Sequence, residues 1–287
     1  MEPRQRAAVR IRPRQVRAAG PRNHRVGVFT AVDGTLLDAR TFDPGKARAV
    51  VQKLTTAGIP VVPISVMTLA EIAPIAADLG LRQPMVIEAG GAIARWKEEG
   101  WDVEPCGPPA ETFLGVVTEI EDRSGANLLV YSAMEESAAA QVSGRSGEML
   151  RASTSRCFSE PFVIESGDLE AVKRAAAAIG FSVRRGRRFF HLCRQCDEGE
   201  AFTRLREELG CDVAIAVGGS PVDAEFLMRA DFPIIVPAPD GSIDAELLAT
   251  VPGARIAPSP APAGWAAAVE ETVRMATSKR RIRSAAS

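Results

Sequence analysis

The sequence predicts an α/β protein in which a parallel sheet, covered by helices on both faces, is interrupted by a smaller inserted domain. Short apolar runs alternate with helical periodicity near both ends of the chain, and the middle third breaks that alternation. Apolar runs without polar alternation are typical of strands that are buried on both faces of a sheet. The length of 287 residues suits one large or two modest domains.

The first half of the predicted core contains three strands and two helices. Strands are expected at residues 26–30, 59–64 and 85–88. A helix is expected to begin at Asp43-Pro44 and to end at Gly58, because Asp is a favoured N-cap and Pro suits the first helical position. Residues 69–79 are also expected to be helical, with a kink at Pro74 unless the helix begins there.

The alternation returns late in the chain. Helices are expected at 198–209, 223–228 and 263–275, and strands at 213–217 and 233–236. Ligands of such sheets bind beyond the carboxyl ends of the strands. We therefore expect four segments to meet in one crevice: the loop 30–35, Ser65, Glu88 and the loop 218–220.

The middle of the chain predicts a separate α+β cap, or lid. Strands are expected at 128–131, 160–165, 181–185 and 187–193, with a helix at 168–179 and a loop at 137–147. Adjacent strand pairs favour an antiparallel sheet with helices on one face. The predicted division is a core of 26–94 and 193–277, a cap of 95–192, and basic tails at 1–25 and 278–287, the first of them disordered.

The charge distribution bears on possible partners. The net charge is −1, but the two tails are basic and the body between them holds 23 basic and 35 acidic residues. An acidic body is a poor non-specific binder of nucleic acid, so a nucleic-acid partner is not expected. No apolar run approaches the ~20 residues that span a bilayer, so no membrane association is expected.

Cysteine usage predicts reduced thiols and a cytoplasmic location. Five cysteines form an odd set, and no secretory signal precedes the first predicted strand. His191, Cys193 and Cys196 form an H-x-C-x-x-C pattern that is compatible with a zinc site. A second Cys/His pair at suitable spacing is absent from the sequence, so free thiols are the favoured interpretation.

Six short motifs in order resemble the haloacid dehalogenase superfamily, and within it the mannosyl-3-phosphoglycerate phosphatase family. They are residues 28–38 (VFTAVDGTLLD), 63–68 (PISVMT), 87–91 (IEAGG), 159–162 (SEPF), 186–191 (GRRFFH), and 218–220 (GGS) with Asp223. The resemblance covers roughly residues 26–277 and implies a Rossmannoid parallel core with an inserted cap.

The resemblance also implies a chemistry for each position. In that family an aspartate attacks the phosphoryl group, and a second aspartate two residues later acts as acid and base. A hydroxyl and a lysine bind the phosphoryl oxygens, and carboxylates hold Mg²⁺. Asp33 matches the acid/base, and Asp223 matches the late acidic residue. The positions expected to bind phosphate or substrate are Gly34, Thr35, Ser65, Glu88, Gly90, Arg187 and His191.

Four positions depart from the family pattern in this chain. Ala31 stands where the nucleophile is expected, and Gly219 stands where a metal-binding aspartate is expected. Glu198 replaces the lysine, and Ala89 replaces an asparagine. We therefore expect no bound metal, with only Asp33 and Asp223 left of its ligands, and we consider Arg194 as a substitute for the lost lysine.

These losses predict a catalytically inactive relative that binds a sugar phosphate or acts as a regulatory pseudophosphatase. The alternative is an active, Mg²⁺-dependent phosphohydrolase of a sugar phosphate such as mannosyl-3-phosphoglycerate. In that case Thr30 or Asp33 acts as the nucleophile, or Asp33 activates a water molecule. A third hypothesis is a structural or regulatory partner of another protein, such as the glycosyltransferase that makes the sugar phosphate.

Overall fold

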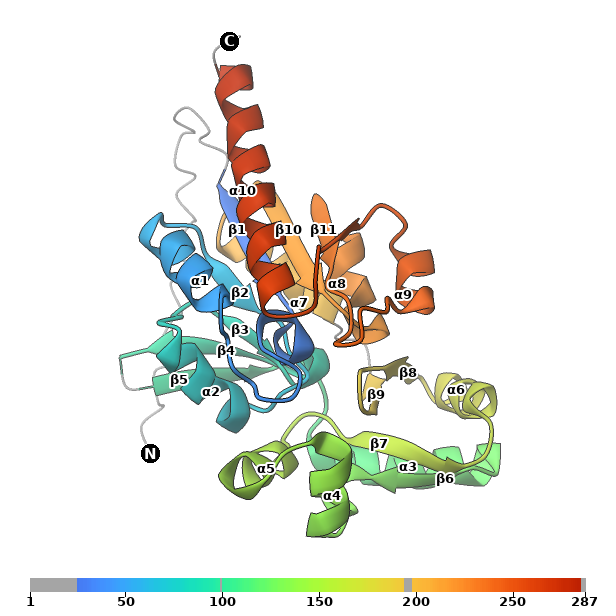
Figure 1. The fold of residues 1–287 in the computed structure, drawn as a ribbon. Coiled ribbons are helices and arrows are strands. Elements are labelled where there is room, and N and C mark those ends of the chain that lie inside the picture. The colour runs from blue at the N-terminus through green and yellow to red at the C-terminus, as the bar shows by residue number, and fades with distance from the viewer. Residues whose placement is uncertain (1–24, 99, 194–197, 285–287) are drawn as a thin grey trace, which may run out of the picture.

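The computed structural model describes residues 25–98, 100–193 and 198–284. Apart from Arg25, the predicted N-terminal tail lies outside these residues, and so do Arg194 and Cys196. The chain forms a core and a cap, and the core lies above the cap in the view of Figure 1.

The core is built on a parallel sheet with the strand order β12-β11-β10-β1-β2. Its strands are β1 (Val26–Thr30), β2 (Val61–Pro63), β10 (Val213–Gly218), β11 (Phe232–Ile235) and β12 (Arg255–Ile256). All pairs in this sheet are parallel. The strand β3 (Met85–Ile87) continues it through a single parallel bridge between Ile64 and Val86. The predicted parallel core is therefore confirmed.

Helices cover both faces of this sheet (Figure 1). One face packs against α1 (Ala47–Thr56), α2 (Leu69–Asp78) and α10 (Ala263–Ser284), and the other packs against α7 (Glu198–Glu208), α8 (Ala224–Met228) and α9 (Ala245–Thr250). Neighbouring strand residues point to opposite faces, so Val28 joins the first hydrophobic cluster and Phe29 joins the second.

A hairpin of β4 (Ala92–Lys97) and β5 (Gly100–Pro105) follows β3. It pairs antiparallel with β3 in a three-stranded sheet of order β3-β4-β5. The sequence-based boundary at residue 95 divides this hairpin between core and cap. Its pairing with β3 places it beside the core.

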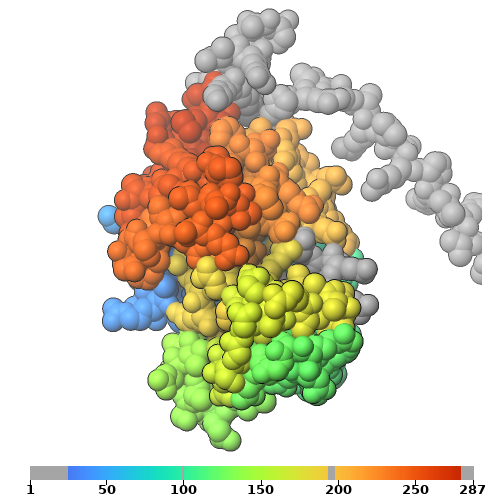
Figure 2. Space-filling model, turned by 90° about the vertical axis from the view of Figure 1, so that its right-hand side faces the viewer, coloured from blue at the N-terminus to red at the C-terminus, as the bar shows by residue number. Residues whose placement is uncertain are grey.

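The cap contains an antiparallel sheet with the order β6-β7-β9-β8. Its strands are β6 (Asn127–Val130), β7 (Pro161–Ser166), β8 (Ser182–Arg185) and β9 (Phe190–Cys193). The helices α3 (Ala110–Ser124) and α6 (Leu169–Ala178) share one hydrophobic cluster with this sheet. Figure 2 shows the cap, in green and yellow, packed below the orange and red part of the core.

The predicted loop at 137–147 is wrong. The helices α4 (Glu136–Ser143) and α5 (Gly147–Thr154) occupy most of it and continue beyond it. Ala139 and Leu150 are buried against Tyr131 and Phe189. These two helices carry few apolar residues, so tertiary packing stabilises them and the sequence shows only a weak periodicity.

Two helix ends also differ from the prediction, whereas α2 begins at Leu69 as predicted. The helix α1 begins at Ala47, because Oδ1 of Asp43 accepts a hydrogen bond from the amide of Gly45 in a turn. The helix α2 contains Pro74 in its interior, and a capping box between Thr68 and Glu71 stabilises its start. The helix α10 continues to Ser284, past its predicted end at 275.

No helix within the described residues combines the length and apolar character that a membrane span requires.

Candidate functional site

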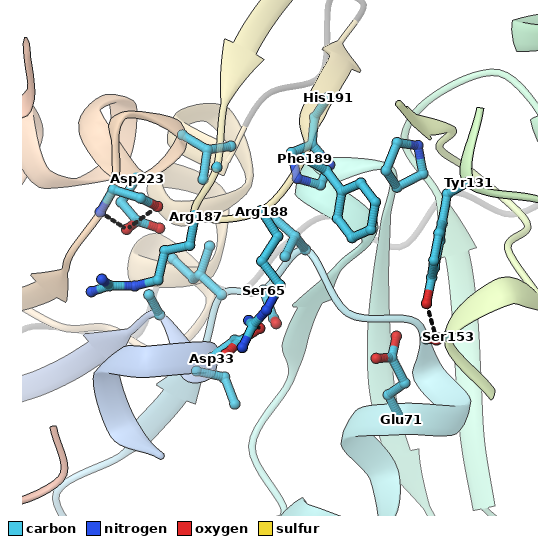
Figure 3. Close-up of a pocket in the computed structure, with 18 of the residues that line it drawn as sticks. Asp33, Ser65, Glu71, Tyr131, Ser153, Arg187, Arg188, Phe189, His191 and Asp223 are labelled. Atoms are coloured by element: carbon cyan, nitrogen blue, oxygen red, sulfur yellow. Dashed lines mark hydrogen bonds and ion pairs between the residues drawn. The ribbon is translucent and has the colours of Figure 1, made fainter. Parts of the chain in front are cut away.

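The candidate site is a cavity between the carboxyl ends of the core strands and the cap (Figure 3). Segments that follow β1, β2 and β10 form its floor, and the cap segment that includes 186–191 forms its roof. Its volume is about 60 Å³. This is far below the ~300 Å³ at the lower end of ligand pockets, so the cap is closed over the site.

The structure separates the twelve predicted site residues into two groups. Those that line the cavity are Ala31, Asp33, Ser65, Arg187, His191 and Asp223. Those that do not line it are Gly34, Thr35, Glu88, Gly90, Glu198 and Gly219.

The loop after β1 presents Ala31 and Asp33 to the cavity. The amide of Ala31 donates to the carbonyl of Val217 over 2.8 Å, which continues the pairing of β1 with β10. Its methyl group therefore occupies a position fixed by the sheet. Oδ2 of Asp33 accepts a hydrogen bond from Nη1 of Arg188 over 2.7 Å and lies 3.5 Å from Nη2 of Arg145. Both cations come from the cap.

Two hydroxyl groups near this loop have different roles. Ser65 lines the cavity, and its Oγ accepts from the amide of Met67 over 3.1 Å, which leaves its O–H proton available as a donor. The hydroxyl of Thr30 donates to the carbonyl of Ala31 and accepts from Nε1 of Trp265. Thr30 is fully buried and lies outside the cavity lining. Its placement argues against the predicted role of Thr30 as an alternative nucleophile.

Asp223 caps the turn that follows β10. Its Oδ2 accepts hydrogen bonds from the amides of Gly219 and Ser220 over 2.7 and 2.8 Å, and from Oγ of Ser220 over 3.1 Å. Burial raises the pKa of Asp223, and these hydrogen bonds and the charge of Arg187 oppose that rise. One of the two carboxylate oxygens of Asp223 is thus held by this turn.

Glu88 joins the core to the cap and does not line the cavity. Its carboxylate accepts from the amides of Cys157 and Phe158 and from Oγ of Ser159, at 2.9 to 3.2 Å. Nε of Arg156 lies 3.7 Å from Oε2 of Glu88. All of these partners belong to the segment before β7, so Glu88 is a structural residue of the closed interface.

Glu198 begins α7 and is buried outside the cavity lining. The residue that replaces the lysine of the family pattern therefore does not face the cavity. Arg194, the substitute for the lost lysine considered above, lies outside the described residues. Thr35 is buried, and Gly90 lies in the turn after β3.

His191 is neutral at physiological pH. Burial and the nearby charge of Arg156 lower its pKa to about 3. The H-x-C-x-x-C pattern lies only partly within the described residues, because Cys196 is outside them. Among the residues that the structure describes, no cluster of three or more His, Cys, Asp or Glu side chains is placed to hold a metal ion.

Sequence reasoning missed two arginines and one acid of the cavity. Arg145, between α4 and α5, donates from Nε to Oε1 of Glu71 over 2.7 Å. Arg156 donates to the carbonyl of Val66 over 2.6 Å. The motifs gave no signal for Arg145, because it lies in the segment predicted as a loop. The lining thus has four arginines, Arg145, Arg156, Arg187 and Arg188, against three acids, Asp33, Glu71 and Asp223, which is a net charge of +1.

The residues present do not fit Mg²⁺, which prefers six oxygen ligands in an octahedron. Ala31 and Gly219 offer no side-chain oxygen where the family resemblance implies two carboxylates. Oδ2 of Asp33 is engaged by arginine, and Oδ2 of Asp223 is engaged by three hydrogen-bond donors. The donor set favours an anion over a divalent cation.

Comparisons with known proteins agree with this architecture. No protein-family profile matches the chain. A glucosyl-3-phosphoglycerate/mannosyl-3-phosphoglycerate phosphatase from Methanococcoides burtonii is 25% identical over 264 residues, which are 86% of this chain and 96% of that protein. A phosphatase of the same description from Persephonella marina is 24% identical over 256 residues, with coverages of 83% and 93%.

A solved haloacid dehalogenase-like hydrolase from Bacteroides thetaiotaomicron has the same fold. It superposes with a TM-score of 0.60 at 17% identity and covers 87% of this chain and 99% of that chain. The chain therefore has the haloacid dehalogenase-like fold, with a parallel core and an inserted cap. In sequence it resembles the mannosyl-3-phosphoglycerate phosphatases, as its six motifs predicted.

Proposed function

We propose that this protein binds a phosphorylated sugar and does not hydrolyse it through an aspartyl-phosphate. The observation that carries the proposal is Ala31, whose methyl group lines the cavity at the position implied for the nucleophile. A methyl group cannot attack phosphorus. The sheet pairing of its backbone fixes this position, so a neighbouring side chain does not move into it without loss of the hydrogen bond to Val217.

The charge of the cavity supports the binding part of the proposal. Its lining carries a net charge of +1 with His191 neutral. Arginine donates in a planar fork that matches phosphate oxygens. Two relatives are named as phosphatases of glucosyl- and mannosyl-3-phosphoglycerate, which supports a sugar phosphate as the ligand. Because the cavity is small, binding requires the cap to open first.

The alternative function is hydrolysis in which Asp33 acts as a general base. One observation favours it: Oδ1 of Asp33 is buried and has no hydrogen-bond partner among the described residues. In this reaction Asp33 accepts a proton from water and the water oxygen bonds to phosphorus. The bond between phosphorus and the sugar oxygen breaks, and the sugar oxygen takes the proton from the Asp33 carboxyl. Arg188 and Arg145 oppose this reaction, because both guanidinium groups lie against Oδ2 of Asp33 and hold the carboxylate in ion pairs with the cap.

Phosphate release from mannosyl-3-phosphoglycerate and p-nitrophenyl phosphate, with Mg²⁺, distinguishes the two functions. We expect the wild-type protein to release no more phosphate than Asp33→Asn prepared in parallel. The matched control is Asp240→Asn, which removes an exposed carboxylate outside the lining of this cavity. Turnover in the wild type and in Asp240→Asn that is lost in Asp33→Asn would establish the alternative.

A thermal-shift titration with mannosyl-3-phosphoglycerate in EDTA tests the binding part. A ligand at 100 times its Kd stabilises the folded state by about 2.7 kcal/mol, so a bound sugar phosphate raises Tm clearly. The absence of any shift up to millimolar ligand, with or without Mg²⁺, would contradict a sugar-phosphate role.

A further inference from the structure

Arg187 extends from the cap into the gap between two core loops. Its Nη2 donates to the carbonyl of Gly34 over 3.0 Å, in the loop after β1. A Cβ atom added to Gly34 would lie 2.7 Å from Nε of Arg187. A Cβ atom added to Gly219, in the loop after β10, would overlap Nη2. The guanidinium therefore lies between the loops from which the family resemblance implies metal-binding carboxylates.

A side chain at position 219 would overlap Arg187, whereas the backbone conformation of Gly219 would accept one. Its φ lies outside the left-handed region that favours glycine, so other residues can adopt this conformation. The atoms that a Cβ would meet are Nη2 and Cζ of Arg187 and, at 3.0 Å, the carbonyl oxygen of Val236. A side chain at position 219 and the guanidinium of Arg187 thus compete for the same space.

The charge of Arg187 also distinguishes it from the other arginines of the cavity. Arg145, Arg156 and Arg188 each lie within 4.0 Å of a carboxylate. Within the described residues Arg187 forms no such ion pair, and its one hydrogen bond goes to the carbonyl of Gly34. Of its five N–H groups, most remain available to a ligand. It also lines a second cavity, on the side of Pro239 and Asp244.

We propose that the guanidinium of Arg187 is the resident cation of this site, in the place of a divalent metal, and that it binds the phosphoryl group of a phosphate monoester. This inference rests on the proposed binding function and specifies its chemistry. An arginine side chain is a permanent cation under physiological conditions, and unlike a metal ion it is not removed by chelators. Since Arg187 belongs to the cap, phosphate binding also stabilises the closed arrangement of cap and core.

Phosphate binding by the full-length protein tests the first consequence. Calorimetric titration with inorganic phosphate and with glucose 6-phosphate should give the same affinity in EDTA and in Mg²⁺. Arg187→Ala should lower that affinity at least 10-fold, and Arg187→Lys should have a smaller effect. The matched control Arg184→Ala removes a different arginine of the cap, which pairs with Glu225 of the core outside the cavity, and should stay within threefold of wild type.

The results also identify the source of the phosphoryl group and can overturn the proposal. Tighter binding of glucose 6-phosphate identifies a sugar phosphate as the ligand class, whereas equal binding identifies free phosphate. Binding that requires Mg²⁺, or that is unchanged in Arg187→Ala, overturns the assignment of Arg187 as the resident cation. Circular dichroism of each variant verifies that it is folded.

A metal-binding test separates this inference from the proposed function. Ala31→Asp/Gly219→Asp restores two carboxylates while Arg187 remains, and a third change, Arg187→Ala, removes the guanidinium. We expect Mg²⁺ to raise Tm by several degrees only in the triple variant. An equal shift in the double variant would show that Arg187 does not occupy the place of the metal. The failure of the wild-type protein to bind phosphate would contradict the proposed function. The shift in Tm with Mg²⁺ would still show, in that case, whether Arg187 occupies the place of the metal.

Discussion

Nη1 of Arg188 donates a hydrogen bond to Oδ2 of Asp33 over 2.7 Å, and this ion pair connects the cap to the loop after the first core strand. Arg188 also donates to the carbonyl of Ala39 in the same loop region. In the closed arrangement, the carboxylate at the acid/base position is therefore neutralised by a residue of the cap. This ion pair therefore contributes to the contact between the cap and the core.

The first prediction concerns the coupling between these two residues. In a double-mutant cycle of Asp33→Asn and Arg188→Ala, we expect a coupling free energy of about 1–3 kcal/mol, because both side chains are largely buried. The measurement is urea unfolding of the four proteins. The same cycle with Arg123 and Glu119, an exposed pair on α3, should give below about 0.5 kcal/mol. Additive effects at Asp33 and Arg188 would show that their contact does not stabilise the fold.

The second prediction concerns Glu88 at the junction of core and cap. Glu88→Gln removes the charge and turns an N–H₂ group toward amide donors, so we expect the free energy of unfolding to fall by about 2–3 kcal/mol. Limited proteolysis should also cut the segment near Cys157 earlier. Glu148→Gln, an exposed site on α5, is the control and should change neither quantity. Unaltered protease sensitivity in Glu88→Gln would mean that this carboxylate does not hold the cap.

The third prediction is a pH dependence of stability that originates in His191. Its folded-state pKa is about 3 and its unfolded value is about 6.5, so between these pH values the unfolded chain binds a proton that the native state does not. Stability from this residue is complete above about pH 6.5 and falls as the pH falls. Between pH 7 and pH 5 the loss is up to about 2 kcal/mol. Urea unfolding of wild type and His191→Gln at both pH values measures this loss. We expect the free energy of unfolding to fall by up to this amount more in the wild type than in the variant, and an equal fall in both proteins would refute the prediction.

The fold was readable from the sequence because core strands and helices carry strong periodic signals. Residues 213–217 are uniformly apolar and residues 26–30 are apolar apart from Thr30, as expected of strands buried on both faces, and both segments lie in the central sheet. The helices α4 and α5 were not predicted, because they contain few apolar residues. Contacts with Tyr131 and Phe189 stabilise them instead. Local sequence contains no information about such partners.

The candidate site was only partly readable for the same reason. Ala31, Asp33 and Asp223 follow core strands, so the topology of a parallel sheet places them together. Arg145 reaches Glu71 across 74 positions of sequence, and Arg156 reaches Glu88 across the core–cap interface. The placement of Arg187 against Gly219 likewise depends on how the cap closes. Sequence reasoning identified the lost carboxylates and named Arg187 as a phosphate or substrate residue, but it could not place Arg187 between the two core loops.

The last prediction is that Ala31→Asp alone does not create a phosphatase. The new carboxylate would enter a cavity that already holds Asp33 and Asp223, while Gly219 still offers no metal ligand and Arg187 remains in place. We expect no Mg²⁺-dependent hydrolysis of p-nitrophenyl phosphate above that of Ala31→Asp/Asp33→Asn. Since Ala31 is buried, the added charge should also lower the free energy of unfolding by about 1–3 kcal/mol. Turnover tenfold above the double variant would instead mean that the nucleophile was the one missing part, and that the surrounding site still supports catalysis.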